Sequence, residues 1–386
     1  MKAVLKSVLD FFSSLGLSCA LLILLALLTY LGTIDQVENG LFDAQKKYFE
    51  SFIVWNAIGP FPLPGAYAVM SVLFVNLLLG GLVRIRKSWA TAGVIIGHIG
   101  ILMMLGAGLV KFHWSKEGHV LLYEGQSKSE FQSYYDWELV LFVPTANETL
   151  REYPIAPKDV EASTGEHGRV FRDPALPFEL QVSHYMRNCR AMRKGPMFEV
   201  NVPVIEGVFL NEMKPEIEAE QNVAGVYVSA RAPDGSHSDV VVQGSTEDEA
   251  PQELRIGGNS YGIQLRKQKF PMPFSVRLDK FTKENQPRID MAKRFSSDVS
   301  ISEPQGTRGV KISMNEPLRD KGLVLYQASW GPSNAKPGER LFSTLAVVDN
   351  PSDKWPLISC IVIAAGMLLH FSRKLVRHVR LEGSKA

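Results

Sequence analysis

The stretch LGLSCALLILLALLTYLGTI at residues 15–34 decides the fold class, because twenty residues pass without a charged side chain. A helix rises about 1.5 Å per residue, so this length covers the roughly 30 Å hydrocarbon core of a bilayer. It is too long for a signal-peptide core and lacks an A-x-A cleavage site, so we expect it to be retained. Similar apolar runs at 65–83, 92–110 and 355–371 predict four transmembrane helices in all.

Three clusters of basic residues flank these runs, and all three fall on one side of the membrane only if both termini are cytoplasmic. They are Lys2, Lys6, Arg84, Arg86, Lys87, Arg373, Lys374, Arg377 and Arg380. Because basic residues accumulate in cytoplasmic loops, we predict that both termini are cytoplasmic and that residues 112–354 are extracytoplasmic. The chain then divides into an N-terminal membrane region at 1–111, an outer domain at 112–354, and a fourth helix with a basic tail at 355–386. Between the first two spans, residues 35–64 predict an interfacial helix followed by a Pro-rich return.

The outer segment changes to alternating apolar and polar residues, the pattern of half-buried strands. Strands are predicted at 138–143, 178–185, 198–204, 223–231, 238–244, 261–268, 274–281, 310–314 and 323–329. Turn signals such as Pro-Asp-Gly at 233–235 separate them. Many short strands without intervening helices favour a sandwich-like, mainly β domain.

Several function classes are disfavoured by composition and by missing motifs. The net charge of +2 gives no reason to expect nucleic-acid binding. The chain has no P-loop, no G-x-S-x-G and no H-E-x-x-H, and its three cysteines form no C-x-x-C. We therefore assign no catalytic residue, and an enzyme acting alone is poorly supported.

His98 interrupts the third span, in AGVIIGHIGILMMLGAG. An ionisable residue at this depth is costly and invites a functional interpretation. A neutral imidazole can bind a metal through one nitrogen and donate a hydrogen bond through the other. Haem iron is a membrane-compatible centre that needs such a ligand, so haem b is the candidate cofactor. The alternative is an interhelical hydrogen bond without a cofactor.

His370 is a second and weaker candidate haem ligand, at the cytoplasmic end of the fourth span. By residue rise it lies within about one helical turn in depth of His98, so the two could flank one ligand. An interfacial histidine beside a basic tail also needs no special role. Gly93, Gly97 and Gly100 share one helix face and predict close approach of another helix. Asn76 in the second span predicts an interhelical hydrogen bond.

The chain resembles the ResB (CcsB) proteins of System II cytochrome c biogenesis. The resemblance lies in the first span with its GTIDQ ending, in GHIGILMMLGAG and EGHVLLYEGQ, and in FSSDVSI at 295–301. It is most specific in MNEPLRDKGLVLYQASWG at 314–331, which follows the family pattern N-x-P-L…G…Y-Q-x-S. The residues that carry this motif are Asn315, Pro317, Leu318, Tyr326 and Gln327. Asp35 stands where the family usually has Pro.

The resemblance implies a function. ResB proteins work in the bacterial inner membrane with CcsA, which carries a tryptophan-rich segment absent here, to bring haem to the outer face for attachment to apocytochrome c. The chain would then be a non-catalytic subunit of a haem-attaching complex, with a thioredoxin-like thiol reductant as a further partner and membrane lipid around its spans. By motif, the membrane haem ligand of fused relatives corresponds to His98. The competing hypothesis is a membrane-anchored β scaffold or receptor with structural histidines and no haem.

Overall fold

The structure is a computed structural model that describes residues 2–145, 149–195, 199–246, 249–285, 292–332 and 339–383. It divides into two compact units. The membrane unit comprises Met1–Ser115 and Asn350–Ala386, and the β unit comprises Lys116–Asp349. The chain enters the β unit after one helix and leaves it directly before another.

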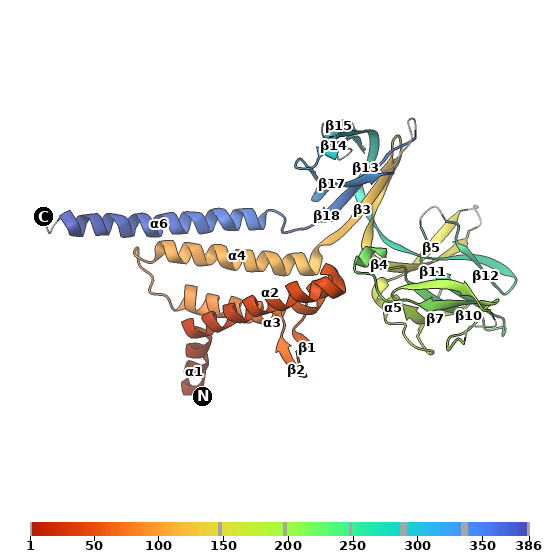
Figure 1. Cartoon of the computed structure of the whole chain (residues 1–386), viewed down its shortest axis with the longest axis horizontal. Helices are drawn as coiled ribbons and strands as arrows, with labels where there is room; N and C mark the ends of the chain where they lie inside the picture. The colour runs from red at the N-terminus through yellow and green to blue at the C-terminus, as the bar shows by residue number, and fades with distance from the viewer. Residues whose placement is uncertain are drawn as a thin grey trace. The chain divides into compact units, whose positions relative to one another are not determined.

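The membrane unit contains the four apolar helices that the sequence predicts (Figure 1). They are α2 (Leu15–Ala44), α3 (Ala66–Asn76) with its π-helical continuation η2 (Leu77–Val83), α4 (Ala92–Trp114) and α6 (Trp355–Gly383). Their mean hydropathy over 18 residues lies between 1.8 and 2.3, and each is long enough to cross a bilayer. The prediction of four membrane-spanning helices is therefore confirmed.

Two helices, α2 and α6, extend well beyond the predicted spans of 15–34 and 355–371. α2 continues past residue 34 and changes direction at Gly40, whose φ of 80° is a conformation that favours glycine. The following helical residues lead into η1 (Gln45–Phe49), and Phe49 packs back against Gly32. The expected Pro-rich return is a hairpin of β1 (Ile53–Ile58) and β2 (Phe61–Pro64). Hydropathy marks where lipid contact ends, whereas helical hydrogen bonding continues into the polar flanks.

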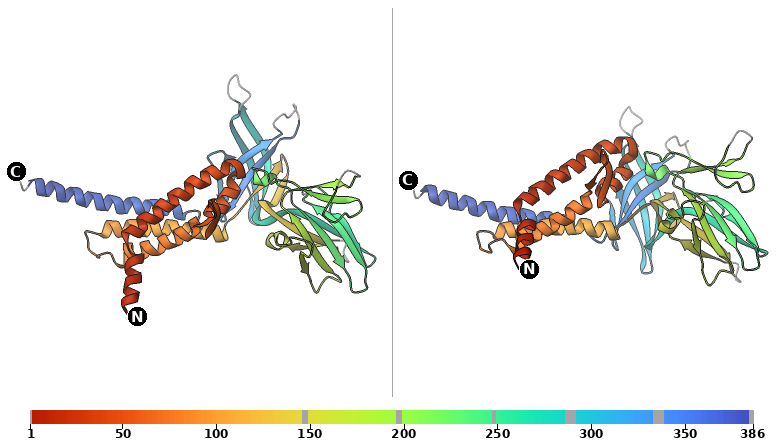
Figure 2. Two further views of the ribbon diagram at one scale, coloured as in Figure 1. Left: turned by 60° about the horizontal axis from the view of Figure 1, so that its bottom comes forward. Right: turned by 90° about the horizontal axis from the view of Figure 1, so that it is seen from below.

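An additional short helix, α1 (Lys2–Phe12), precedes the first span and was not predicted. It runs steeply across the direction of α2, as the views in Figures 1 and 2 agree. Asn76 fixes the corner between them by donating to the carbonyls of Phe12 and Ser14 at 2.8 and 3.0 Å and accepting from the Ser18 hydroxyl at 2.6 Å. The predicted interhelical hydrogen bonding by Asn76 is thus confirmed.

The β unit is built almost entirely of antiparallel strands. Its strands are β3 (Lys116–Tyr123), β4 (Ser127–Pro144), β5 (Leu150–Ile155), β6 (Arg169–Phe171), β7 (Glu179–Met186), β8 (Cys189–Arg193), β9 (Val208–Glu212), β10 (Gly225–Arg231), β11 (His237–Gln243), β12 (Gln252–Ile256), β13 (Asn259–Asn285), β14 (Ala292–Glu303), β15 (Gly306–Ser313), β16 (Leu318–Asp320), β17 (Leu323–Gly331) and β18 (Phe342–Asp349). Two short helices, α5 (Pro157–Glu161) and η3 (Ala219–Gln221), lie between them.

The principal sheet has ten strands in the order β15-β14-β13-β4-β3-β18-β17-β16, with β12 on β13 and β5 on β4. A hydrogen bond from the Ser297 hydroxyl of β14 to the amide oxygen of Gln327 on β17 joins strands that are distant along this order, so the sheet curls toward closure. A second sheet, in the order β11-β10-β7-β6, packs against part of the two longest strands, β4 and β13. The predicted mainly β domain is confirmed.

Two apolar cores result from the length of β4 and β13. Leu139 and Leu265 belong to the core shared with the four-stranded sheet, and Phe131 and Leu278 belong to the core inside the curled part of the ten-stranded sheet. A single pair of long strands therefore supplies both cores, and the segments predicted as strands at 261–268 and 274–281 are one strand.

The strand predicted at 198–204 is wrong over residues 199–204, which connect β8 to β9 without strand structure. Residue 198 lies outside the described residues. The segment alternates apolar and polar side chains, but Pro203 has no N–H to donate to a ladder. The pairing of β8 with β9 then places these residues in the connection.

Candidate functional site

His98 lies in the apolar middle of α4, half-buried, with its imidazole directed at η2. Its Nδ1 is 3.0 Å from the carbonyl oxygen of Gly81. Since a carbonyl can only accept, the neutral ring donates from Nδ1 and carries its lone pair on Nε2. A histidine that binds a metal usually has this second interaction, which fixes the tautomer and the ring orientation.

Gly81 is needed for this contact. A Cβ atom at Gly81 would lie 2.5 Å from His98 Nδ1, closer than real Cβ atoms approach, and 3.0 Å from Leu77 Cδ1, which is a tight contact. The residue lies in the π-helical segment η2, a distortion that occurs often at functional positions. Sequence reasoning missed Gly81; the only signal was the Gly80-Gly81 pair inside an otherwise leucine-rich span.

The opposite side of α4 packs closely against α6 through glycine. A Cβ at Gly366 would lie 2.6 Å from the Gly93 carbonyl and 2.6 Å from the Gly97 nitrogen, and one at Gly100 would lie 2.6 Å from Ile363 Cγ1. The predicted close approach of a helix along this glycine face is confirmed. Small residues permit such an approach in a bilayer, where packing rather than hydrophobicity holds helices together.

The two candidate histidine ligands lie on different sides of α4. The main chain of His370 lies against Gly93, with its nitrogen 2.7 Å from where a Cβ of Gly93 would be. Five residues separate Gly93 from His98, a rotation of about 140° around the helix. His98 faces η2 and Gly81, whereas the His370 ring lies beside Phe371 with 5.4 Å between ring centroids. This arrangement assigns His98 and His370 to separate environments.

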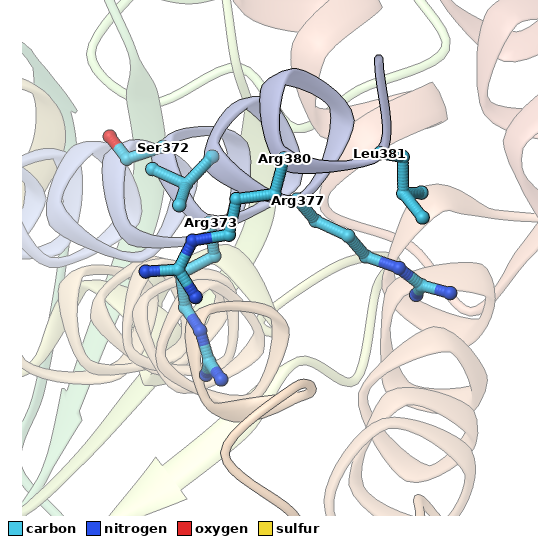
Figure 3. Close-up of a pocket in the computed structure, with 6 residues that line it drawn as sticks. Ser372, Arg373, Arg377, Arg380 and Leu381 are labelled. Atoms are coloured by element: carbon cyan, nitrogen blue, oxygen red, sulfur yellow. The ribbon is translucent and has the colours of Figure 1, made fainter. Parts of the chain in front are cut away.

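Beyond His370, α6 continues as a basic extension, residues 372–383. A pocket of 490 Å³ lies along it (Figure 3). It is lined by Ser372, Arg373, Val376, Arg377, Arg380 and Leu381. All of these residues come from one helix, so the pocket is an open groove and suits a flexible anionic group better than an enclosed ligand.

The family motif of the β unit forms a buried polar network. The Gln327 amide nitrogen donates to the Ser343 hydroxyl at 2.8 Å, and the Ser297 hydroxyl lies 2.6 Å from the Gln327 amide oxygen. All three side chains are buried, so their hydrogen bonds replace those lost to water. Gln327 therefore ties β17 to β14 and β18, which is a role in the fold; sequence reasoning named Ser297 only as part of the FSSDVSI stretch and did not single out Ser343.

The other motif residues lie near one end of the same strands. Asn315 is in the turn that follows β15, Pro317 precedes β16, and Leu318 on β16 is buried in the core with 6% exposure. Tyr326 precedes Gln327 on β17 and is half-buried. The N-x-P-L block thus shapes the edge hairpin β16–β17, and the Y-Q-x-S block crosses the core of the curled sheet.

Nothing in the described ranges forms a cluster of three or more histidine, cysteine, aspartate or glutamate side chains placed to hold a metal ion. The described part of this chain therefore offers no complete set of such ligands for a bare metal ion at His98. That is compatible with haem, because the porphyrin supplies four nitrogen ligands and the protein supplies only the axial positions. The donor set, one half-buried neutral imidazole with an oriented Nδ1–H, fits a haem ligand.

Residues 234–340 match the model of the ResB-like family. A 94-residue segment is 30% identical to a protein of Microcystis aeruginosa named cytochrome c biogenesis protein CcsB, covering 22% of this chain and 21% of that protein. Proteins of the same name from Trichormus variabilis and Prochlorococcus marinus are 38% identical over 96 residues and 46% identical over 57 residues. These segments cover 22% and 14% of this chain and 20% and 13% of the relatives.

The aligned segments thus span about a fifth or less of the length of these curated relatives. The family match contains both halves of the predicted motif, including Asn315 and Gln327, whereas His98 lies outside it. The resemblance predicted from the motifs is therefore confirmed: residues 234–340 are similar to the ResB-like family, and the relatives that match are named cytochrome c biogenesis protein CcsB.

Proposed function

We propose that this chain is a membrane subunit of cytochrome c biogenesis that holds haem b within the bilayer and presents it for attachment to apocytochrome c. Its working partner would be a CcsA-type protein, with a thioredoxin-like thiol reductant acting on the same apocytochrome. The names of the relatives support a role in cytochrome c biogenesis, and the matched segment of the β unit contains the motif that the resemblance rests on. The chain itself would be a non-catalytic subunit.

The observation that carries the haem assignment is the hydrogen bond between His98 Nδ1 and the Gly81 carbonyl. It fixes the tautomer and the orientation of the ring, and it leaves the Nε2 lone pair for iron. The porphyrin of haem would supply the four equatorial nitrogen ligands, so the protein needs to supply only axial ligands. Because His370 lies on another side of α4, the second axial ligand is expected from the partner rather than from His370.

The charge distribution of the membrane unit supports the proposed orientation. Contacts between Gly93 and His370 place the basic extension of α6 at the end of the bundle where η2 leads into Arg84 and Arg86. The amino-terminal Lys6 lies at this end as well, because α1 is fixed there by Asn76. We propose an inner-membrane location with this basic end in the cytoplasm and the β unit outside. The β unit would then meet apocytochrome c.

The test is the absorption spectrum of the full chain purified alone and with its CcsA-type partner. His98→Ala is expected to reduce the Soret absorbance per protein about tenfold, because the axial ligand is lost. His113→Ala is the matched control: it removes an exposed histidine at the end of the same helix. Equal haem content in the two variants, with normal cytochrome maturation, would refute the assignment of His98 as a haem ligand.

The competing function, a membrane-anchored β scaffold without haem, draws support from the same hydrogen bond. The contact also joins α4 to η2, which is a sufficient structural role for a buried histidine. In that case His98→Gln, which can still donate to the Gly81 carbonyl, would preserve both stability and cytochrome maturation. Under the haem proposal His98→Gln retains the fold but loses the haem absorbance.

A further inference from the structure

α1 is an amphipathic helix whose apolar face is uncovered. Val4, Leu5, Val8 and Phe11 are exposed, by 68, 60, 45 and 59%. At 100° per residue these side chains, with Leu9 and Phe12, fill one half of the helix circumference. Lys6, Ser7 and Asp10 occupy the other half. A helix with this division is typical of a membrane surface.

The direction of α1 is set by contacts that hold it to the end of the bundle. Arg84 pairs with Asp10 at 2.6 Å and donates to the Ser13 hydroxyl at 2.5 Å. Asn76 binds the carbonyl of Phe12, and a Cβ at Gly80 would lie 2.9 Å from the carbonyl oxygen of Ser13. The corner is therefore closely packed on η2, and α1 crosses the axis of the spans (Figure 2). A helix held across the spans at their end lies along the plane of the membrane surface.

The charge at this end is complementary to anionic lipid. The α6 extension brings Arg373, Arg377 and Arg380 to the groove in Figure 3, about one to three turns beyond the contact of His370 with Gly93. Their spacing of four and three residues places them on one face of the helix. Arginines beside a transmembrane helix are the usual ligands of phosphate headgroups.

We propose that α1 lies in the bilayer interface with its apolar face in the acyl region, and that it and the α6 arginines bind anionic phospholipid around the basic end of the bundle. The occupant is a lipid rather than a partner helix, because α1 leads directly into the first membrane span, α2, and the surrounding charge is positive. This surface is independent of the haem assignment.

The first test measures depth in the full chain, reconstituted in nanodiscs of phosphatidylcholine and phosphatidylglycerol. Nitroxide labels are placed at Val8→Cys and, as the matched polar-face control, at Ser7→Cys, in a background with Cys19, Cys189 and Cys360 replaced by alanine. We expect the label at 8 to be accessible to oxygen but shielded from a water-soluble nickel complex, and the label at 7 to show the reverse. Equal aqueous accessibility at both positions, or shielding at 8 only when a partner protein is added, would overturn the proposal.

Hydrogen exchange on the unsubstituted chain covers the case in which the cysteine variants fail to fold. Amides of α1 should exchange more slowly in nanodiscs that contain phosphatidylglycerol than in phosphatidylcholine alone. The second lipid test compares spin-labelled phosphatidylglycerol with spin-labelled phosphatidylcholine at the protein boundary. We expect a preference of about twofold or more for the anionic lipid. It should fall toward equality in R373Q/R377Q/R380Q, and an unchanged preference in that variant refutes the role of the arginines.

Discussion

Replacing Gly81 by alanine is expected to weaken haem binding while leaving the ligand His98 in place. The new methyl carbon would lie 2.5 Å from Nδ1, whereas ordinary contacts between such atoms exceed 3.4 Å. About 1 Å of displacement is therefore required. A shift of that size stretches the present 3.0 Å hydrogen bond beyond the range in which it holds the ring. The substitution thus acts on the second interaction of the proposed ligand.

Loss of such an orienting partner typically weakens metal binding by roughly 10- to 100-fold. At about 1.4 kcal/mol per factor of ten, this corresponds to about 1.4–2.8 kcal/mol. The effect should be smaller than that of His98→Ala, which removes the iron ligand itself.

The assay is haem titration of the full chain together with its partner, followed by Soret absorbance. Gly97→Ala is the matched control: it adds the same methyl group one residue from His98, at a position where a Cβ has no neighbour within 4 Å. Haem affinity in Gly97→Ala should equal that of the unsubstituted chain. If Gly81→Ala and Gly97→Ala bind haem with the same affinity, the hydrogen bond does not orient a ligand and the reasoning fails.

Three further predictions concern stability. Gln327→Ala removes the amide that bonds to the buried hydroxyls of Ser297 and Ser343, which keep only their bond to each other, and should lower the unfolding free energy by about 1–3 kcal/mol, seen as a lower thermal midpoint of the near-ultraviolet signal; an unchanged midpoint would show that the Gln327 amide contributes nothing. Gly366→Ala should destabilise the membrane unit by roughly 1–3 kcal/mol through overpacking against Gly93, whereas Gly97→Ala should not, as judged by thermal aggregation in detergent. Burial lowers the pKa of Lys267 to about 8, so the unfolded chain holds this proton up to about pH 10.5 while the folded chain has released it. The unfolding free energy then rises with pH between about pH 8 and pH 10.5. Lys267→Met should have a higher unfolding free energy than the unsubstituted chain below pH 8, and the difference between the two proteins should shrink toward pH 10.5. Chemical denaturation at a series of pH values measures this difference, and a difference that does not change with pH would contradict the prediction.

The candidate site was only partly predictable from the sequence. His98 stands out because an ionisable residue inside an apolar run is costly wherever the helix packs. Its partner Gly81 carries no side chain and contributes a main-chain carbonyl, which a sequence pattern does not reveal. Likewise, the depth argument places His370 near His98, but the rotation of α4 between Gly93 and His98 separates them.

The β unit shows the same limit on a larger scale. Period-two alternation identifies most strands, because it reports which side chains face a core. It does not report that β4 and β13 are long enough to serve two cores, since that depends on which strands pair. The motif residue Gln327 was visible in the sequence, and only its contact with Ser297 across the curled sheet explains its chemistry.

The sequence alone determined the four spans, the clustering of basic residues and the mainly β character of the middle of the chain. These follow from local properties, the apolar length of a segment and the period of its polarity. Tertiary structure alone decided the Gly81 contact of His98, the direction of α1 and the closing network of Gln327. Each depends on atoms that are far apart along the chain and are brought within hydrogen-bonding distance only by packing, which no local pattern encodes.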